Sequence, residues 1–93
     1  MKDEEKITIP LPVVLSREGK WFVASCPILD IATQGRNEKE VKENVEDLIE
    51  DYFQDPDTPK PTIKTMMSAS VSVINIPIKI RTSHGKASVV KSG

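Results

Sequence analysis

The sequence is poor in the residues that carry most redox and metal chemistry. It contains one cysteine, Cys26, and one histidine, His84. A single cysteine excludes an internal disulfide, and one cysteine with one distant histidine cannot supply the four ligands of a structural zinc site. We therefore expect no metal and no cofactor, and a single unpaired thiol favours an intracellular, cytoplasmic protein.

Long hydrophobic runs and aromatic residues are also scarce. No apolar segment approaches the ~20 residues that a membrane-spanning helix needs, so we expect no membrane partner. The chain begins with the charged residues MKDEEKI, unlike a signal peptide. Aromatic residues make up 4% of the sequence, so the core must consist mainly of Val, Ile and Leu. A chain of this size buries only about 60–65% of its unfolded surface, which makes association a plausible source of stability.

Acidic residues are absent from the last third of the chain. Residues 58–93 carry six basic residues and no acidic ones, whereas residues 36–57 carry three basic and nine acidic residues. The net charge of −1 hides this separation. Separated charge bears on partners rather than on fold. The acidic segment suits a basic protein partner, and the basic third can contact the phosphates of a nucleic acid.

The first third of the sequence indicates an antiparallel meander. The β-branched segment 7–15 predicts a first strand, whose well-paired part begins after its prolines. Residues 16–20 contain a glycine and predict a hairpin loop. Residues 20–26 predict a second strand, and residues 28–33 a third, shorter one. Three consecutive strands with short connections form a meander.

An amphipathic helix follows the meander. Asn37 is a suitable N-cap, and Glu40 lies at the spacing of a capping box. Gly35 is expected to supply a backbone conformation, between strand and helix, that a residue with a Cβ would resist. The loop is a poor phosphate site, because it has one glycine and leads into a helix that begins with acidic residues. The apolar residues recur at helical spacing and form one stripe: Val41, Val45, Leu48, Ile49, Tyr52 and Phe53.

Residues 66–80 predict a long last strand whose apolar face changes. Up to Val73 apolar residues alternate with serine, and from Ile74 the alternation is inverted. Fifteen residues in a strand would span ~50 Å, so the second half should leave its own sheet. We expect the inverted residues to form a homodimer interface, with a β-bulge that returns them to their own core as the alternative. They are Ile74, Ile76, Ile78 and Ile80.

The sequence shows no set of residues suited to catalysis. His84 lies in the polar, basic segment 81–93, which we expect to be a disordered tail. Cys26 has no histidine near it in sequence and suits a small buried apolar residue. The acidic residues cluster on the polar face of the helix, and only Asp30 lies at a strand end that can face a cleft. We therefore expect a protein that is not an enzyme and has no catalytic residues.

The segment from Leu11 to about Pro56 resembles the HicB-like antitoxin family. The resemblance rests on VVLSREGKWFVASCPILDIATQGRNEKEVKENVEDLIEDYF. In it a charged turn ending in glycine joins two strands, and ATQG leads into a helix rich in glutamate. The resemblance implies a β-β-β-α-β fold related to a reduced ribonuclease-H-like fold. It also implies oligomerisation and neutralisation of a small ribonuclease toxin of the double-stranded-RNA-binding type.

These observations together predict one α+β domain over residues 1–80, with an antiparallel meander, one helix packed on the sheet and a long C-terminal strand. The expected function is that of a non-catalytic, antitoxin-type protein-binding module. Two alternatives stay open: a nucleic-acid-binding regulator that uses the basic C-terminal third, and a stand-alone ligand-binding domain. The basic third contains no aromatic residue on which a base could stack and no helical periodicity of a helix-turn-helix.

Overall fold

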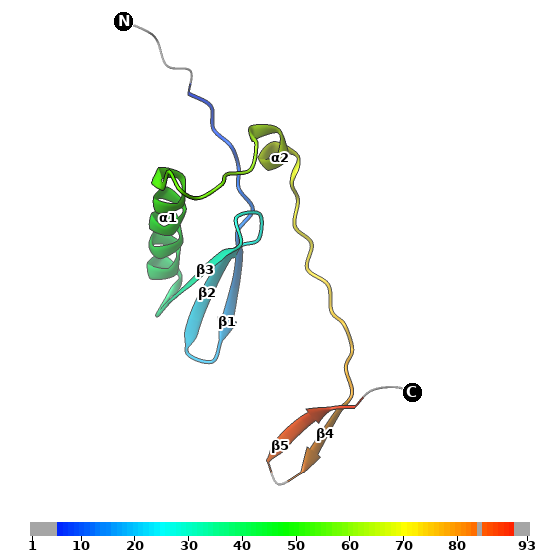
Figure 1. The fold of residues 1–93 in the computed structure, drawn as a ribbon. Coiled ribbons are helices and arrows are strands. Elements are labelled where there is room, and N and C mark those ends of the chain that lie inside the picture. The colour runs from blue at the N-terminus through cyan, green and yellow to red at the C-terminus, as the bar shows by residue number, and fades with distance from the viewer. Residues whose placement is uncertain (1–5, 84, 91–93) are drawn as a thin grey trace, which may run out of the picture.

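The computed structural model describes residues 6–83 and 85–90. A three-stranded sheet with one long helix is followed by an extended segment and a hairpin (Figure 1). The predicted α+β class is confirmed, as is the order of three antiparallel strands followed by a helix. The elements are β1 (Val14–Glu18), β2 (Trp21–Cys26), β3 (Ile31–Gly35), α1 (Glu38–Gln54), α2 (Ile63–Ser68), β4 (Ile80–Ser83) and β5 (Lys86–Val89).

The first hairpin is tighter than the sequence predicts. Glu18 pairs with Trp21 across a two-residue loop. In that loop Gly19 has a φ of 63°, in the left-handed region that favours glycine. Strand β1 therefore continues into residues predicted to be loop.

A second tight turn joins β2 to β3. The backbone N–H of Leu29 donates to the carbonyl of Cys26 at 3.1 Å, and that of Asp30 donates to the carbonyl of Pro27 at 3.2 Å. Asp30 has a φ of 55°, which aspartate tolerates better than most residues with a side chain. The side chain of Asp30 is exposed on this turn.

Helix α1 begins at a well-formed cap. The Asn37 side chain accepts a hydrogen bond from the backbone N–H of Glu40 at 2.8 Å. The Glu40 carboxylate accepts one in return from the backbone N–H of Arg36 at 3.4 Å. The turn before α1 is thus held from both sides, close to the reciprocal arrangement of a capping box.

This cap gives the first testable prediction. Asn37→Ala should lower the free energy of unfolding by about 0.5–2 kcal/mol, because the N–H of Glu40 loses its acceptor. Urea denaturation followed by circular dichroism measures the change. Glu43→Gln, on the exposed face of α1, is the control and should stay within about 0.5 kcal/mol of wild type. Equal effects of the two substitutions would contradict the role of the cap.

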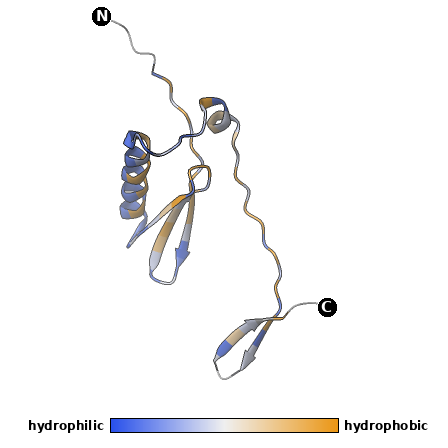
Figure 2. Cartoon of the chain, in the orientation of Figure 1, coloured by the Kyte–Doolittle hydropathy of each residue, from blue (hydrophilic) through white to orange (hydrophobic). Residues whose placement is uncertain are grey.

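The core lies between α1 and the strands β2 and β3. Ala24 and Val41 are fully buried, and Val45 is 4% exposed. Figure 2 shows the apolar side of α1 turned toward the sheet and its polar side turned outward. The burial of the predicted stripe decreases along the helix, since Leu48 is half-buried and Phe53 is 39% exposed. Only one face of the sheet is covered by a helix.

Gly35 allows strand β3 to approach helix α1 closely. A Cβ at Gly35 would lie 2.6 Å from the backbone nitrogen of Val41 and 2.9 Å from its Cα atom. The φ of Gly35 is not positive, in contrast to those of Gly19 and Gly85. The need for glycine is therefore correctly placed by the sequence, but its reason is steric packing and not a special backbone conformation.

The connector after α1, residues 55–62, is held to the end of the helix by hydrogen bonds. The hydroxyl of Tyr52 donates to the carbonyl of Pro59 at 2.9 Å. The carboxylate of Asp55 accepts hydrogen bonds from the Thr58 hydroxyl at 2.6 Å and from the Asp57 N–H at 2.9 Å. These hydrogen bonds, that from Thr58 foremost, lower the pKa of Asp55. The path of the chain out of the domain is thus fixed by local contacts.

The C-terminal part differs from the prediction of one strand over residues 66–80. Met66 lies in the short helix α2, whose N-cap Thr62 accepts from the backbone N–H of Thr65 at 3.1 Å. The segment 69–79 is extended but, within the described residues, pairs with no strand. Pairing begins only at Ile80, the first residue of β4.

The expectation of a disordered tail is wrong for the described residues 81–83 and 85–90. Strands β4 and β5 form an antiparallel hairpin in which Ser83 pairs with Lys86. Gly85, in the connecting turn, has a φ of 75°. His84 and residues 91–93, which belong to the same expected tail, lie outside the described residues.

The extended segment makes the chain far less compact than its length requires. The radius of gyration is 18.4 Å, whereas a compact domain of this length has a value of about 12 Å. Among the described elements, β4 and β5 contact only each other. The hairpin therefore stands apart from the core.

Candidate functional site

The most unusual surface of the molecule is the segment of residues 69–80, which we call the arm. From Val73 onward its apolar side chains point into solvent: Val73 is 79% exposed, Ile74 74%, Ile76 71%, Ile78 60% and Ile80 51%. The β-bulge alternative, which would return the four isoleucines to their own core, does not occur. Monomeric proteins rarely expose a contiguous apolar patch, so this row of isoleucines is a candidate interaction surface.

Most of the arm's backbone, like its isoleucine side chains, has no partner within the described chain. In the described part of the chain, no backbone hydrogen bond involves residues 70–78. The nearest one joins the N–H of Val90 to the carbonyl of Lys79 at 2.8 Å, where the hairpin begins. An extended segment with free N–H and C=O groups can add itself as a strand to an open sheet edge.

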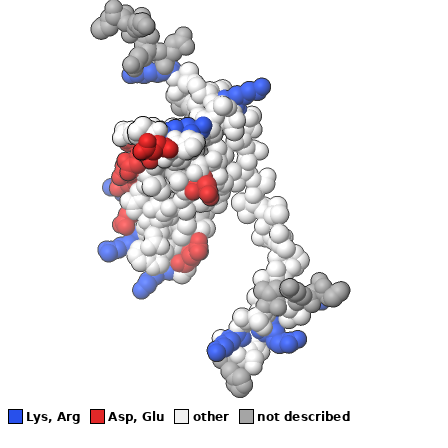
Figure 3. Space-filling model, viewed as in Figure 1, with Lys and Arg blue, Asp and Glu red and all other residues white. Residues whose placement is uncertain are grey.

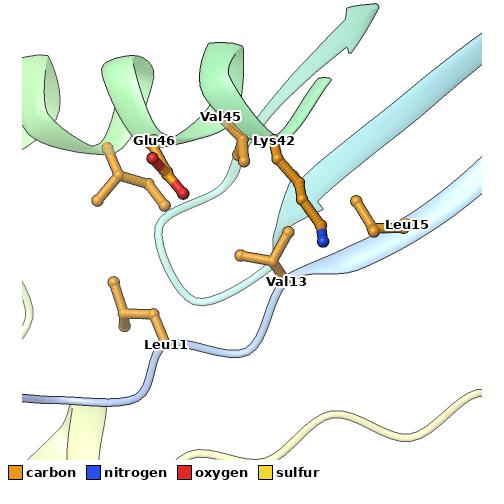
Figure 4. Close-up of a pocket in the computed structure, with 7 residues that line it drawn as sticks. Leu11, Val13, Leu15, Lys42, Val45 and Glu46 are labelled. Carbon is orange, nitrogen blue, oxygen red and sulfur yellow. The ribbon is translucent and has the colours of Figure 1, made fainter. Parts of the chain in front are cut away.

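A second open surface is the groove between β1 and α1, which we call the β1–α1 groove (Figure 4). It has a volume of ≈ 540 Å³. One wall consists of Leu15 in β1 and two residues of the segment before it, which alternate along the chain. The lining residues are Leu11, Val13 and Leu15 on that wall, and Lys42, Val45, Glu46 and Ile49 on α1.

The position of α1 over the sheet explains why the groove is open. Helix α1 packs on β3 and β2 and has no comparable contact with β1. It is also tied to β3, because the amide of Asn44 donates to the carbonyl of Gln34 at 2.9 Å. The edge of β3 is thus partly covered, whereas no strand among the described residues pairs with the outer edge of β1.

Charge is distributed unevenly over these surfaces. Figure 3 shows acidic side chains over α1 and basic side chains on the hairpin at the far end of the arm. Glu43, Asp47 and Glu50 lie exposed on the side of α1 turned away from the sheet. Arg81 and Lys86 are exposed on β4 and β5, next to Lys79 of the arm.

The residues considered for catalysis do not come together. The thiol of Cys26 is fully buried at the end of β2, as expected for a small apolar residue. Asp30 is exposed on a turn, and His84 lies outside the described residues. Residues 6–83 and 85–90 contain no group of three His, Cys, Asp or Glu side chains that could hold a metal ion. Two further hollows have no acidic residue in their lining, which consists of Val23, Ala32, Thr33 and Gln34 in one and Lys20, Trp21 and Arg36 in the other.

The predicted residues therefore occupy two separate places. Gly35, Asn37 and Glu40 meet at the junction of β3 and α1, where they shape the domain. The four isoleucines lie on the arm. Sequence reasoning missed the β1–α1 groove, although the alternation of Leu11, Val13 and Leu15 is a signal for one wall of it.

Two findings bear on the identity of the chain. In the part of the chain that the structure describes, no helix is both long enough and apolar enough to span a membrane. A comparison of the chain with models of protein families, with curated proteins and with solved structures finds no match.

Proposed function

We propose that this protein is a non-catalytic, cytoplasmic protein-binding module of the HicB-like antitoxin type that neutralises a small basic ribonuclease. The observation that carries the proposal is the exposed acidic face of α1 beside an apolar groove on the same helix. Acidic side chains attract a basic partner over a distance, and the apolar groove offers surface that the partner can bury.

The acidic face should act mainly on the rate of association. Opposite charges steer an encounter, and steering is weakened as salt screens the charges. A ribonuclease that binds nucleic acid carries a basic surface, because it must neutralise phosphates. The surface of α1 is thus complementary to the surface such an enzyme needs for its substrate, so binding there would block RNA.

The probe for this proposal is a small basic ribonuclease encoded next to this chain. We expect the pure protein to inhibit its cleavage of RNA, with association slowing as salt rises. The triple variant Glu43→Gln, Asp47→Asn and Glu50→Gln should reduce the association rate at low salt about tenfold, because it removes the steering charges. Surface plasmon resonance with the ribonuclease immobilised, at several salt concentrations, measures this association rate.

The matched control is Glu18→Gln, which removes an exposed carboxylate from the β1–β2 hairpin and should leave the rate unchanged. A salt-independent association rate would remove the steering role from α1. A neighbour that is not a ribonuclease, or one whose activity the protein leaves intact, would overturn the antitoxin proposal.

A second candidate function is nucleic-acid binding through the hairpin. A two-stranded ribbon fits the major groove of DNA, and β4–β5 carries Arg81 and Lys86. If the hairpin binds duplex DNA, Arg81→Ala with Lys86→Ala should weaken binding. The slope of the logarithm of the binding constant against the logarithm of salt concentration should fall by about 2, because two phosphate contacts are lost. Fluorescence anisotropy with a labelled duplex tests this, and no binding at low salt excludes it.

The proposal includes association of the chain with itself. The exposed isoleucines of the arm and the unpaired edge of β1 are both liabilities in water unless they are covered. A homodimer that covers them is the simplest assembly, because closed two-fold dimers are the commonest oligomers.

A further inference from the structure

We propose that the arm of one copy docks as an added strand on the free edge of β1 in a second copy, with its isoleucines in the β1–α1 groove. The second copy returns the same contact, so two arms and two grooves are used. This inference rests on the self-association proposed above and names the surface that receives the arm.

The arm and the hairpin both lack partners in a single copy. The arm offers a free backbone from residue 70 to residue 78 and a row of exposed isoleucines. The hairpin β4–β5 contacts no other described element. A two-stranded hairpin alone is at best marginally stable in water, so it requires support from another surface.

The groove has the spacing that the arm requires. Side chains on one face of an extended chain recur every ~6.6 Å, and both Ile74, Ile76 and Ile78 on the arm and Leu11, Val13 and Leu15 on the groove wall are spaced two residues apart. A strand added beside β1 would pair its free N–H and C=O groups with that edge. It would also place its apolar face under α1, beside Val45 and Ile49.

Burial decreases along the arm, which indicates that its isoleucines pack on a second copy and not on the arm's own domain. Ala69 and Val71, at its start, are half-buried, whereas Val73 and all residues after it on the arm are exposed. The side chains that touch their own domain thus precede the inversion, and the isoleucines follow it on the opposite face. The fastened connector and the buried Met66 hold the start of the arm in this orientation.

Charge favours the groove over a second arm as the partner. Lys79 is the only charged residue of the arm, so a second arm offers it no acidic partner. In the groove of a second copy, Lys79 would find an acidic partner in Glu46, which lines the groove together with Lys42. The same chain therefore carries both complementary surfaces.

Disulfide trapping tests this contact directly. Leu15→Cys places a thiol in the groove, and Ile74→Cys, Ile76→Cys and Ile78→Cys place thiols at three registers of the arm. Each arm variant is mixed with the Leu15→Cys variant and oxidised. We expect a disulfide-linked heterodimer for at least one register, because cysteines on neighbouring strands can reach the ~3.8 Å Cβ separation that a disulfide needs.

The controls separate the possible outcomes. Ser16→Cys lies on β1 but on the opposite face of the sheet, and should trap none of the arm variants. Wild type should also form no cross-link, because Cys26 is fully buried. A cross-link within one chain, when both cysteines are placed on it at high dilution, would overturn the inference in favour of closure on the arm's own domain.

Two further outcomes distinguish this inference from the broader proposal. A protein that is dimeric by sedimentation but gives no groove–arm cross-link, or gives only arm–arm cross-links, overturns the docking site and leaves self-association intact. A protein that is monomeric at high micromolar concentration overturns both. Inhibition of a ribonuclease is measured independently of either result.

Discussion

Gly35→Ala should lower the free energy of unfolding by about 3 kcal/mol, the upper end of the usual cost of overpacking. The added methyl group would lie 2.6 Å from the backbone nitrogen of Val41, which no rotamer change can relieve. Either β3 and α1 move apart or the first turn of the helix distorts. Because a domain of this size is stable by only about 5–14 kcal/mol, the loss is a large fraction of the total. The midpoint of urea denaturation measures it.

A comparison with Gly19 separates packing from backbone conformation. Asparagine tolerates a positive φ, and a Cβ at Gly19 meets nothing within 4 Å. Gly19→Asn should therefore be mild, whereas Gly35→Asn should be at least as harmful as Gly35→Ala. Similar costs of asparagine at the two positions would contradict the steric explanation of Gly35.

Ile76→Lys combined with Ile78→Lys should convert the protein from a dimer to a folded monomer. Two lysines cannot be buried in the β1–α1 groove without a large desolvation cost. Residues 73–80 of the arm are exposed and make no contribution to the core of their own domain, so the secondary structure of the domain should remain. Size-exclusion chromatography with light scattering gives the mass, and circular dichroism reports the fold.

The matched control adds the same two charges to the other face of the arm. Val73→Lys with Asn75→Lys alters residues that alternate with the isoleucines, and these residues should stay outside the groove. This variant should remain dimeric. Equal dissociation of both variants would indicate general charge repulsion and not the loss of isoleucine contacts.

The part of the fold set by local signals was predictable from the sequence. The side chain of Asn37, the apolar spacing from Val41 onward and the glycine of the first hairpin each act within a few residues. The meander needs only short connections, so its strand order followed from the sequence as well. The sequence also predicted that position 35 needs a glycine. The reason, the close approach of Gly35 to the backbone of Val41, depends on how the helix packs and was not predictable.

The C-terminal third was harder to predict because its signals compete. Alternating apolar residues and serines favour a strand over 66–73, but the Thr62 cap and the good helix propensity of methionine start helix α2 instead. The hairpin was missed because its polar composition is typical of disorder. Gly85 between two short β-branched segments was the available signal for it.

The groove could not be predicted from local sequence. It exists because α1 lies over β2 and β3, and that placement depends on Gly35 and on the bond between Asn44 and Gln34. These contacts join residues on different elements, so no single segment shows them. The exposure of the arm, in contrast, was implied by its length and by the change of its apolar face.

Hydrogen exchange of the backbone amides of residues 70–78 tests the docking of the arm most directly. These amides have no hydrogen-bond partner in a single described chain. We predict rapid exchange at low concentration and, at high micromolar concentration, protection of every second amide, because alternate N–H groups of an added edge strand point toward β1 and Pro77 has no N–H. Rapid exchange at both concentrations would contradict docking, and protection that persists where sedimentation shows a monomer would show that the arm closes on its own domain.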